Sequence, residues 1–349
     1  MSTTSNSGAT FAAYLAEKRH VIEAYIETHA PAPLSEELTA PDLDRYLYTP
    51  LARFTASGGK RTRPALCLLG CEAVGGTDAL ALSSAAAIED FQSAALIHDD
   101  IADEGELRRG KPCVYLSEGT GIAINVGDLA LVAVTAKILR DETLEPAVRM
   151  RVLEGLVSME ERTLEGQALD LGWVRDGRWD ISTRDYLRMA SHKTAFYSAA
   201  TPLSVGAICG GGTDEQIEAL GSFGMDAGLA FQLQDDLLNL VGNAVAQGKD
   251  FRSDITEGKR TMIVTWAIEH LAGTERGELV SILSSHATDA ATLQRGVELM
   301  ETAGAVAAAR EYAHSLAQSA KNDLAGVKLA DGTRQVLESM ADFFVERTE

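Results

Sequence analysis

The chain has 349 residues, 46% of them hydrophobic, and its 51 acidic and 31 basic residues give a formal net charge of −20. This composition fits a folded globular protein and argues against nucleic acid as a partner, because phosphate backbones need a basic footprint. Residues 1–9 lack basic charge and an apolar run. We therefore expect a disordered segment over residues 1–10 and no signal peptide.

The longest apolar stretch, residues 122–139, is interrupted by Asn125, Asp128 and Lys137, so we expect no transmembrane segment. The four cysteines form no CxxC pair, which favours buried reduced thiols over a metal or redox motif. These features together predict a cytoplasmic protein.

Helical periodicity dominates the chain, because apolar residues recur at steps of three and four and convincing alternating strands are absent. Only eight prolines occur, none of them after Pro202. We therefore expect an all-α fold with one domain over residues 1–349, built as a single large bundle of about a dozen helices around a central cavity. Polar breaks are expected at residues 29–34, 56–60, 104–120, 172–181, 210–214 and 242–258.

In chain order, the first unusual segment is SGGKRTRP, residues 57–64. It places Lys60, Arg61 and Arg63 after two glycines and before Pro64, a residue that suits the first turn of a helix, where anions bind well. The segment is not a Walker A loop, because the required glycine and Ser/Thr are missing. Each cation taken singly could equally be an ordinary surface charge.

An alanine-rich helix over residues 79–99 leads into the first acidic cluster, LIHDDIADEGELRRGKP. Asp99 and Asp103 are one helical turn apart and Asp100 is adjacent, so their charges repel unless a cation lies between them. A second cluster follows in AFQLQDDLLNLVGN, where Asp235 and Asp236 are adjacent and Asn239 is one turn on.

Carboxylates from two facing helices are typical ligands of Mg²⁺, a hard ion that is often shared with substrate phosphates. A solvated acidic face is the alternative for either cluster alone. Basic groups near such a site would bind the phosphate oxygens that the metal does not reach. Besides the first segment, the candidates are Arg108, Arg109, Lys193, Lys249 and Lys259.

An ordered set of motifs over roughly residues 50–265 resembles the trans-isoprenyl diphosphate synthases, also called polyprenyl synthetases. A lone DDxxD motif is weak evidence, whereas the ordered set is highly specific. The motifs are GGKRTRP, the first aspartate cluster with LRRGKP, EGQALDL at 165–171, HKTA at 192–195, FQLQDD at 231–236 and GKDFRSDITEGKRT at 248–261.

The resemblance implies an isoprenoid synthase fold, usually a homodimer, that condenses isopentenyl diphosphate with an allylic diphosphate (dimethylallyl, geranyl or farnesyl). It also implies Mg²⁺, with three ions per active site. The metal ligands implied are Asp99, Asp100, Asp103, Asp235, Asp236 and Asn239. The implied contacts of the allylic diphosphate are Arg108, Lys193, Lys249 and Lys259. Those implied for isopentenyl diphosphate are Lys60, Arg63, Gln92 and Arg109. Thr194 and Gln232 are implied to line the region where the carbocation forms.

One position departs from the family pattern: the second motif usually ends in Asp, and Asn239 stands there. Its carbonyl oxygen could still bind a metal ion or orient a water, but without charge. We expect activity to be retained.

Product length in this family is set by residues four and five positions before the first motif, here Ala95 and Ala94. Both are small, so the resemblance predicts an open channel down to Phe91, about 12 Å from Asp99 along the helix. We therefore expect C20 geranylgeranyl diphosphate, within a bracket of C15 to C25. The alternative is that Phe91 is an ordinary core aromatic.

Two rival functions remain open. A class I terpene cyclase uses a similar acidic bundle, but its second site carries an Asn/Asp, Ser/Thr, Glu pattern that DDLLNLVGN does not supply. A noncatalytic subunit of a prenyl synthase would typically lack the first aspartates, which are intact here.

Overall fold

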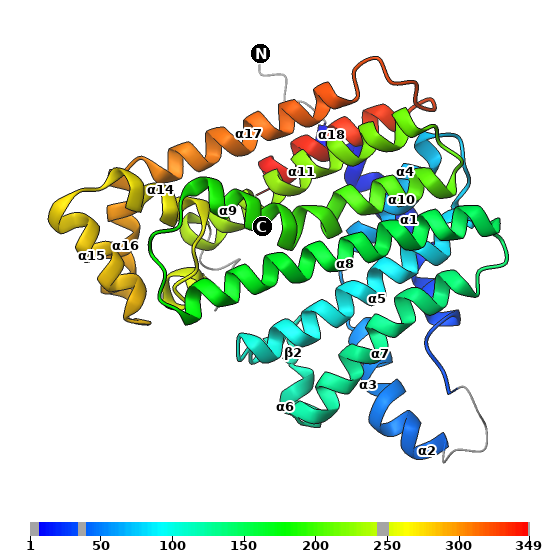
Figure 1. Ribbon diagram of the computed structural model, residues 1–349, viewed down its shortest axis with the longest axis horizontal. Helices are drawn as coiled ribbons and strands as arrows, with labels where there is room; N and C mark the ends of the chain where they lie inside the picture. The colour runs from blue at the N-terminus through cyan, green and yellow to red at the C-terminus, as the bar shows by residue number, and fades with distance from the viewer. Residues whose placement is uncertain (1–6, 34–39, 243–250, 348–349) are drawn as a thin grey trace.

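Helices account for nearly all regular structure in the computed structural model, which describes residues 7–33, 40–242 and 251–347 (Figure 1). In the described residues, β structure is limited to one antiparallel pair, β1 (Leu107–Arg108) and β2 (Lys111–Pro112). The first helices are α1 (Ser7–Thr28), α2 (Ala40–Leu43), η1 (Asp44–Tyr48), α3 (Thr49–Thr55), α4 (Thr62–Ala73) and α5 (Asp78–Ala102). The all-α prediction is confirmed.

The central helices follow the first acidic cluster and include one wide π-helical segment, η2, continuous with its α-helical neighbours. They are α6 (Val114–Glu118), α7 (Thr120–Leu139), α8 (Pro146–Arg175), α9 (Thr183–Ala190), η2 (Ser191–Ala200), α10 (Thr201–Cys209) and α11 (Asp214–Val241). The last helices are α13 (Ser253–Thr256), α14 (Met262–His270), α15 (Gly273–Ser284), α16 (Ala290–Thr302), α17 (Ala305–Asp323) and α18 (Thr333–Glu346).

Local sequence signals explain where several helices begin. Helix α11 starts at a capping box, in which the Thr213 hydroxyl accepts from the Gln216 amide and the Gln216 side chain accepts from the Thr213 amide. Pro146 lies in the first turn of α8, where its missing N–H costs nothing. The break expected at 104–120 is not wholly irregular, because it contains the β pair and α6.

Long helices packed side by side form the body of the bundle (Figure 1). Helix α5 packs along α7, α4 along α10, and α11 between η2 and α17. The main core runs through these contacts, and a smaller core lies where α3 and α5 meet α7. All four cysteines are buried thiols without a disulfide bond, as expected. This packing brings the C-terminal ends of α5 and α8 close to η2 and α11.

Helices α1 and α7 bear on the expected disordered start of the chain and on the expected absence of a transmembrane segment. Helix α1 begins at Ser7, inside the segment expected to be disordered, while residues 1–6 lie outside the described residues. Within the described residues, α7 is the one helix long and apolar enough to cross a membrane by length and composition. However, α7 packs on α5, and its Lys137 forms an ion pair with the buried Asp90.

Candidate active site

Three carboxylates gather where α5 ends, a place where the helix dipole disfavours negative charge. Asp100 is buried, and its Oδ1 accepts from Arg108 Nε at 2.9 Å and Nη2 at 2.6 Å. Arg108 belongs to β1, so the short β pair places a cation beside Asp100. The second oxygen of Asp100 is buried without any partner. A buried acceptor in that state would be satisfied by a cation or a water molecule.

The other two carboxylates of the first motif contact different elements. Asp99 Oδ1 accepts from Gln167 Nε2 of α8 at 3.1 Å. Asp103 Oδ2 lies 3.3 Å from Lys259 Nζ. Burial raises the pKa of Asp103 despite the opposing charge of Lys259. The first motif is therefore tied to α8 and to the segment that precedes α14.

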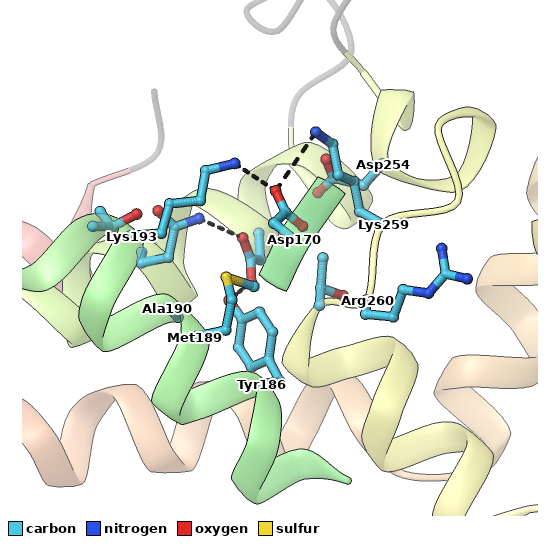
Figure 2. Close-up of a pocket in the computed structure, with 12 residues that line it drawn as sticks. Asp170, Tyr186, Met189, Ala190, Lys193, Asp254, Lys259 and Arg260 are labelled. Carbon is cyan, nitrogen blue, oxygen red and sulfur yellow. Dashed lines mark hydrogen bonds and ion pairs between the residues drawn. The ribbon is translucent and has the colours of Figure 1, made fainter. Parts of the chain in front are cut away.

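Asp170 on α8 is the meeting point of two predicted lysines. Lys193 of η2 donates to Asp170 Oδ2 at 2.5 Å, and Lys259 Nζ lies 4.0 Å from the same oxygen (Figure 2). Burial alone would raise the pKa of Asp170, but the two ammonium groups lower it. Gly166 makes this possible, because a Cβ there would lie 2.2 Å from the Lys193 backbone nitrogen.

The second motif is held by hydrogen bonds from three directions. Asp236 is buried, and it accepts from the Tyr186 hydroxyl and from Gln232 Nε2, the latter at 2.8 Å. Burial, reinforced by the neighbouring Asp254 carboxylate, raises the pKa of Asp236 well above its ordinary value. Asp235 forms an ion pair with Arg347, which follows α18. Burial also raises the pKa of Asp254, to about 7.

Asp170, Asp236 and Asp254 line a cavity of about 160 Å³ (Figure 2). The predicted residues Lys193, Thr194, Gln232, Asp236 and Lys259 all line it. We call it the acidic cavity. Lys259 both lines this cavity and pairs with Asp103, so it connects the first acidic motif to the cavity that Asp236 of the second motif lines.

Asn239, predicted as a metal ligand, is engaged elsewhere. Its Nδ2 donates to Ser253 Oγ at 3.1 Å, and its Oδ1 accepts from the Asp254 amide at 3.3 Å. Asn239 thereby anchors the segment that carries Asp254, and it does not line the acidic cavity. Lys249, predicted to contact the allylic diphosphate, lies outside the described residues.

A second cavity, of about 150 Å³, holds the four residues predicted to bind isopentenyl diphosphate, and we call it the basic cavity. Arg63 donates to Ser198 Oγ at 2.8 Å and lies 4.3 Å from the Tyr197 ring centroid. Oriented by its neighbours, the Gln92 amide accepts from Arg63 Nη1 at 3.1 Å. The four predicted residues that line the cavity are Lys60, Arg63, Gln92 and Arg109.

Two of the arginines that line the basic cavity have a strained backbone. Arg61 and Arg109 both adopt left-handed backbone conformations, with φ of 51° and 54°. Such conformations are costly for non-glycine residues and concentrate at functional sites. Burial lowers the pKa of Arg109, and the nearby guanidinium groups lower it further despite Glu89. Gly59 leaves space for Arg109, because a Cβ there would lie 3.1 Å from Arg109 Nη2.

A third, mainly apolar cavity of about 230 Å³ extends from Asp99 and Lys193 between α5, α7 and α8. We call it the apolar cavity. Ala95 and Phe91 line it, and the Phe91 ring packs edge-on against Tyr197 with centroids 5.7 Å apart. Ala94, the other predicted channel residue, is fully buried in the smaller core and does not line this cavity. Small residues on one α5 face therefore open the cavity, whereas Ala94 serves packing.

Known proteins match this chain over most of its length. The family model Polyprenyl synthetase matches residues 44–300. A short chain isoprenyl diphosphate synthase of Methanothermobacter thermautotrophicus is 39% identical over 83% of this chain and 87% of its own. A geranylfarnesyl diphosphate synthase of Natronomonas pharaonis is 36% identical over 96% and 97%. The crystal structure of geranylgeranyl pyrophosphate synthetase from Pyrococcus horikoshii superposes with TM-score 0.87, at 33% identity over 97% and 98%.

The chain therefore belongs to the polyprenyl synthetase family and has the isoprenoid synthase fold. Its activity is that of a trans-prenyltransferase, an isoprenyl diphosphate synthase whose product range of C15 to C25 agrees with those relatives. The predicted fold, family and enzyme class are confirmed.

Several residues of the site were not predicted. Asp170 and Asp254 lie inside motifs quoted from the sequence, and helical spacing from Gly166 could have singled out Asp170. Tyr186 and Arg347 carry no local signal, since one is an apolar-face tyrosine of α9 and the other lies beyond α18.

Proposed function

We propose that the enzyme condenses isopentenyl diphosphate with an allylic diphosphate and releases C20 geranylgeranyl diphosphate. The observation that carries this proposal is the presence of three neighbouring cavities with different chemistry. The acidic cavity suits a metal-bound diphosphate, the basic cavity a diphosphate bound by cations, and the apolar cavity a growing hydrocarbon chain.

The donor set supports Mg²⁺ as the metal. The carboxylates of both motifs are hard oxygen ligands, and the buried unpartnered oxygen of Asp100 is a position that a cation would satisfy. Among the described residues, no group of three or more acidic, cysteine or histidine side chains is arranged to hold a metal ion without further ligands. Instead, Arg108 pairs with Asp100, Lys259 with Asp103 and Asp170, and Arg347 with Asp235. We infer that the carboxylates of both motifs would hold three Mg²⁺ ions together with the substrate diphosphate, and that the ions would supply Lewis acidity when bound.

The cations around the acidic cavity would assist departure of the allylic diphosphate. Lys193 and Lys259 are both held charged, because the Asp170 carboxylate raises the pKa of each against the opposing effect of burial. Each could donate to diphosphate oxygens as negative charge develops. Thr194 is buried beside them. Gln232 donates to Asp236 through its Nε2 atom, and its side-chain oxygen is not used in that bond. Their oxygen dipoles would stabilise the allylic cation while the buried walls exclude water.

The basic cavity would hold isopentenyl diphosphate in position for attack. Arg63 Nε is buried without a partner, which is the state expected of a donor that awaits an anion. The isopentenyl double bond would attack the allylic cation, and a proton would then be lost to the departed diphosphate. This mechanism needs no protein nucleophile.

The C20 proposal depends on the Phe91–Tyr197 contact at the end of the apolar cavity. If this pair stops the chain, Phe91→Ala should give products longer than the wild type, measured by chromatography and mass spectrometry. Unchanged product length would remove Phe91 as the stop.

The experiment that tests the function is an assay of the isolated protein with Mg²⁺, isopentenyl diphosphate and labelled dimethylallyl or farnesyl diphosphate. A linear C20 diphosphate supports the proposal. A cyclic hydrocarbon would indicate a terpene cyclase, and no reaction would indicate a noncatalytic subunit.

We also propose a homodimer formed through α7 and α8. Their outer faces expose a row of large apolar side chains, which a second copy would cover. These side chains are Ile124, Val132, Leu139, Met150, Val157, Leu164, Leu169 and Leu171. Val132→Glu should convert the dimer to a monomer in light scattering. A monomeric wild type would contradict the proposal.

A cytoplasmic location is part of the same proposal. Burial of the apolar surface of α7 between α5 and a second copy would leave no exposed span for a membrane. Fractionation of cells that express the protein should place it in the supernatant at high speed. Recovery in the membrane pellet would contradict this location.

A further inference from the structure

Arg260 lines the acidic cavity, yet its side chain has no part in the chemistry proposed above. Lys259 extends toward Asp170, whereas the neighbouring Arg260 extends away from it, to the loop between α8 and α9 (Figure 2). Arg260 is only 3% exposed. Among the described residues, its guanidinium donates to two backbone carbonyl oxygens and to no carboxylate. Burial of a charge without an ion-pair partner is costly, so the contacts of Arg260 call for an explanation.

Three contacts hold the guanidinium of Arg260 in place. Its Nε donates to the Arg178 carbonyl oxygen at 2.8 Å, and its Nη1 donates to the Gly258 carbonyl oxygen at 2.5 Å. Its Cζ lies 3.8 Å from the centroid of the Trp179 ring, within the range of a cation–π contact. Trp179 is in turn held by α15, because its Nε1 donates to Ser284 Oγ at 3.0 Å. Arg260 therefore ties the loop after α8 to the turn between α13 and α14.

The Gly258 carbonyl belongs to the peptide unit from which Lys259 projects. Arg260 holds the carbonyl oxygen of this unit, and the N–H of the same unit, on Lys259, donates to the Asp254 carbonyl oxygen at 2.9 Å. Gly258 has a φ of 64°, and a Cβ there would lie 2.9 Å from the Leu283 carbonyl oxygen of α15. Because a peptide unit is planar, fixing both of its polar groups fixes the direction in which the Lys259 side chain leaves the backbone.

That direction decides what the Lys259 ammonium reaches. Its Nζ lies 3.3 Å from Asp103 Oδ2 and 4.0 Å from Asp170 Oδ2. A rotation of the peptide unit would be carried along the flexible lysine stem and would displace the ammonium group from this position. We propose that Arg260, held against Trp179, is a positioning residue that directs Lys259 at the allylic diphosphate. The inference rests on the proposed prenyl-transfer function of this site.

Substitution of Arg260 tests the proposal against a matched control. Arg260→Lys keeps the charge but lacks the planar fork that bonds both carbonyl oxygens. The KM for the allylic diphosphate should therefore rise about tenfold, while the KM for isopentenyl diphosphate should stay within about twofold of wild type. Arg178→Met should be neutral, because only the backbone carbonyl of Arg178 contacts Arg260 and its exposed side chain pairs with Asp180.

The aromatic contact gives a second test with its own conservative variant. Trp179→Leu removes the ring face, so it should raise the KM for the allylic diphosphate about fivefold. Trp179→Phe keeps an aromatic face and should restore that KM to within about twofold of wild type. Equal KM values for the leucine and phenylalanine variants would show that the ring face does not hold Arg260.

The readout is initial-rate kinetics of purified full-length protein with Mg²⁺, varying farnesyl diphosphate and isopentenyl diphosphate in turn. Urea unfolding measures the stability of each variant separately. A purely structural Arg260 would lower stability and leave both KM values unchanged, and that result would overturn the inference. An equal rise in both KM values, or an Arg260→Lys variant that does not fold, would overturn it as well. A wild type without prenyl transfer would instead overturn the proposed function itself.

Discussion

Consecutive residues of α11 line the acidic and basic cavities, Gln232 the first and Phe231 the second, yet charge is balanced in opposite ways in the two cavities. In the acidic cavity, carboxylates and lysines already satisfy one another, as Asp170 does with Lys193 and Lys259. In the basic cavity, Arg63 keeps a buried nitrogen without a partner and Arg109 is strained and crowded by like charge. The first must exchange partners to bind a diphosphate, whereas the second is already prepared for an anion.

This difference suggests how the two substrates differ in their needs. Under the proposed assignment, a diphosphate in the acidic cavity would compete with carboxylates, so it would need divalent ions to reverse the local charge. A diphosphate in the basic cavity would meet donors that are positioned in advance, so it would need no metal. Substitutions in the two cavities should therefore change different kinetic constants.

The largest effect is expected from Asp100→Asn in the first acidic motif, at the end of α5. It removes the charge that pairs with Arg108 and that the proposed Mg²⁺ would use, so kcat should fall at least a hundredfold, roughly the cost of losing one key electrostatic group. Steady-state kinetics with both substrates measure it. Glu104→Gln changes an exposed carboxylate nearby and should be neutral. A kcat for Asp100→Asn within a few-fold of wild type would break the comparison.

Arg63→Met should act mainly on the second substrate. Loss of a charged donor in the basic cavity should raise the KM for isopentenyl diphosphate about ten- to a hundredfold while the KM for the allylic substrate changes little. The matched control is Arg53→Met, on the exposed surface of α3. Equal increases in both KM values would show that the two cavities do not bind separate diphosphates.

Helix α8 extends the comparison to a carboxylate outside the three cavities, Glu160, whose buried Oε1 has no hydrogen-bond partner. The pKa of Glu160 is about 7 in the folded protein against 4.5 ordinarily, so the folded state binds more protons than the unfolded state between these values. Stability should therefore fall as pH rises from about 4.5 to 7.

Glu160→Gln should abolish that part of the pH dependence and stabilise the protein at pH 8. Urea unfolding of variant and wild type at pH 5 and pH 8 measures the difference. A wild type that gains stability over Glu160→Gln as pH rises would contradict the shifted pKa.

The smallest effect is expected at Asn239, the position where the family pattern usually has Asp. Asp at position 239 would keep the oxygen that accepts from the Asp254 amide, and the Ser253 hydroxyl could donate in place of the lost amide group. Asn239→Asp should therefore change kcat by less than about threefold. A large loss would show that the amide has a specific role in positioning Asp254.

The sequence predicted the fold class and both acidic motifs because these depend on local information. Helical periodicity needs only neighbouring residues, and Asp99 to Asp103 form a motif within one turn. The placement of Lys60, Arg63, Gln92 and Arg109 around one cavity also followed from ordered motifs.

What could not be predicted depends on how helices distant in sequence pack together. Arg347 reaches Asp235 from beyond α18, and Tyr186 reaches Asp236 from α9. Ala94 and Ala95 are adjacent in the sequence, yet only Ala95 lines the apolar cavity, since helical phase directs Ala94 into the smaller core. Contacts of this kind are set by tertiary packing, so the local sequence around each residue does not predict them.

The π-helical winding of η2 has a consequence for comparing relatives. A π turn contains more residues than an α turn, and such segments are rare and concentrate at functional sites. Deletion of a single residue within Ser191–Ala200 could restore α winding, but every side chain after it would rotate by about 100°. An alignment gap here would therefore change which residues face the substrate, whereas the same gap in a surface loop would be harmless.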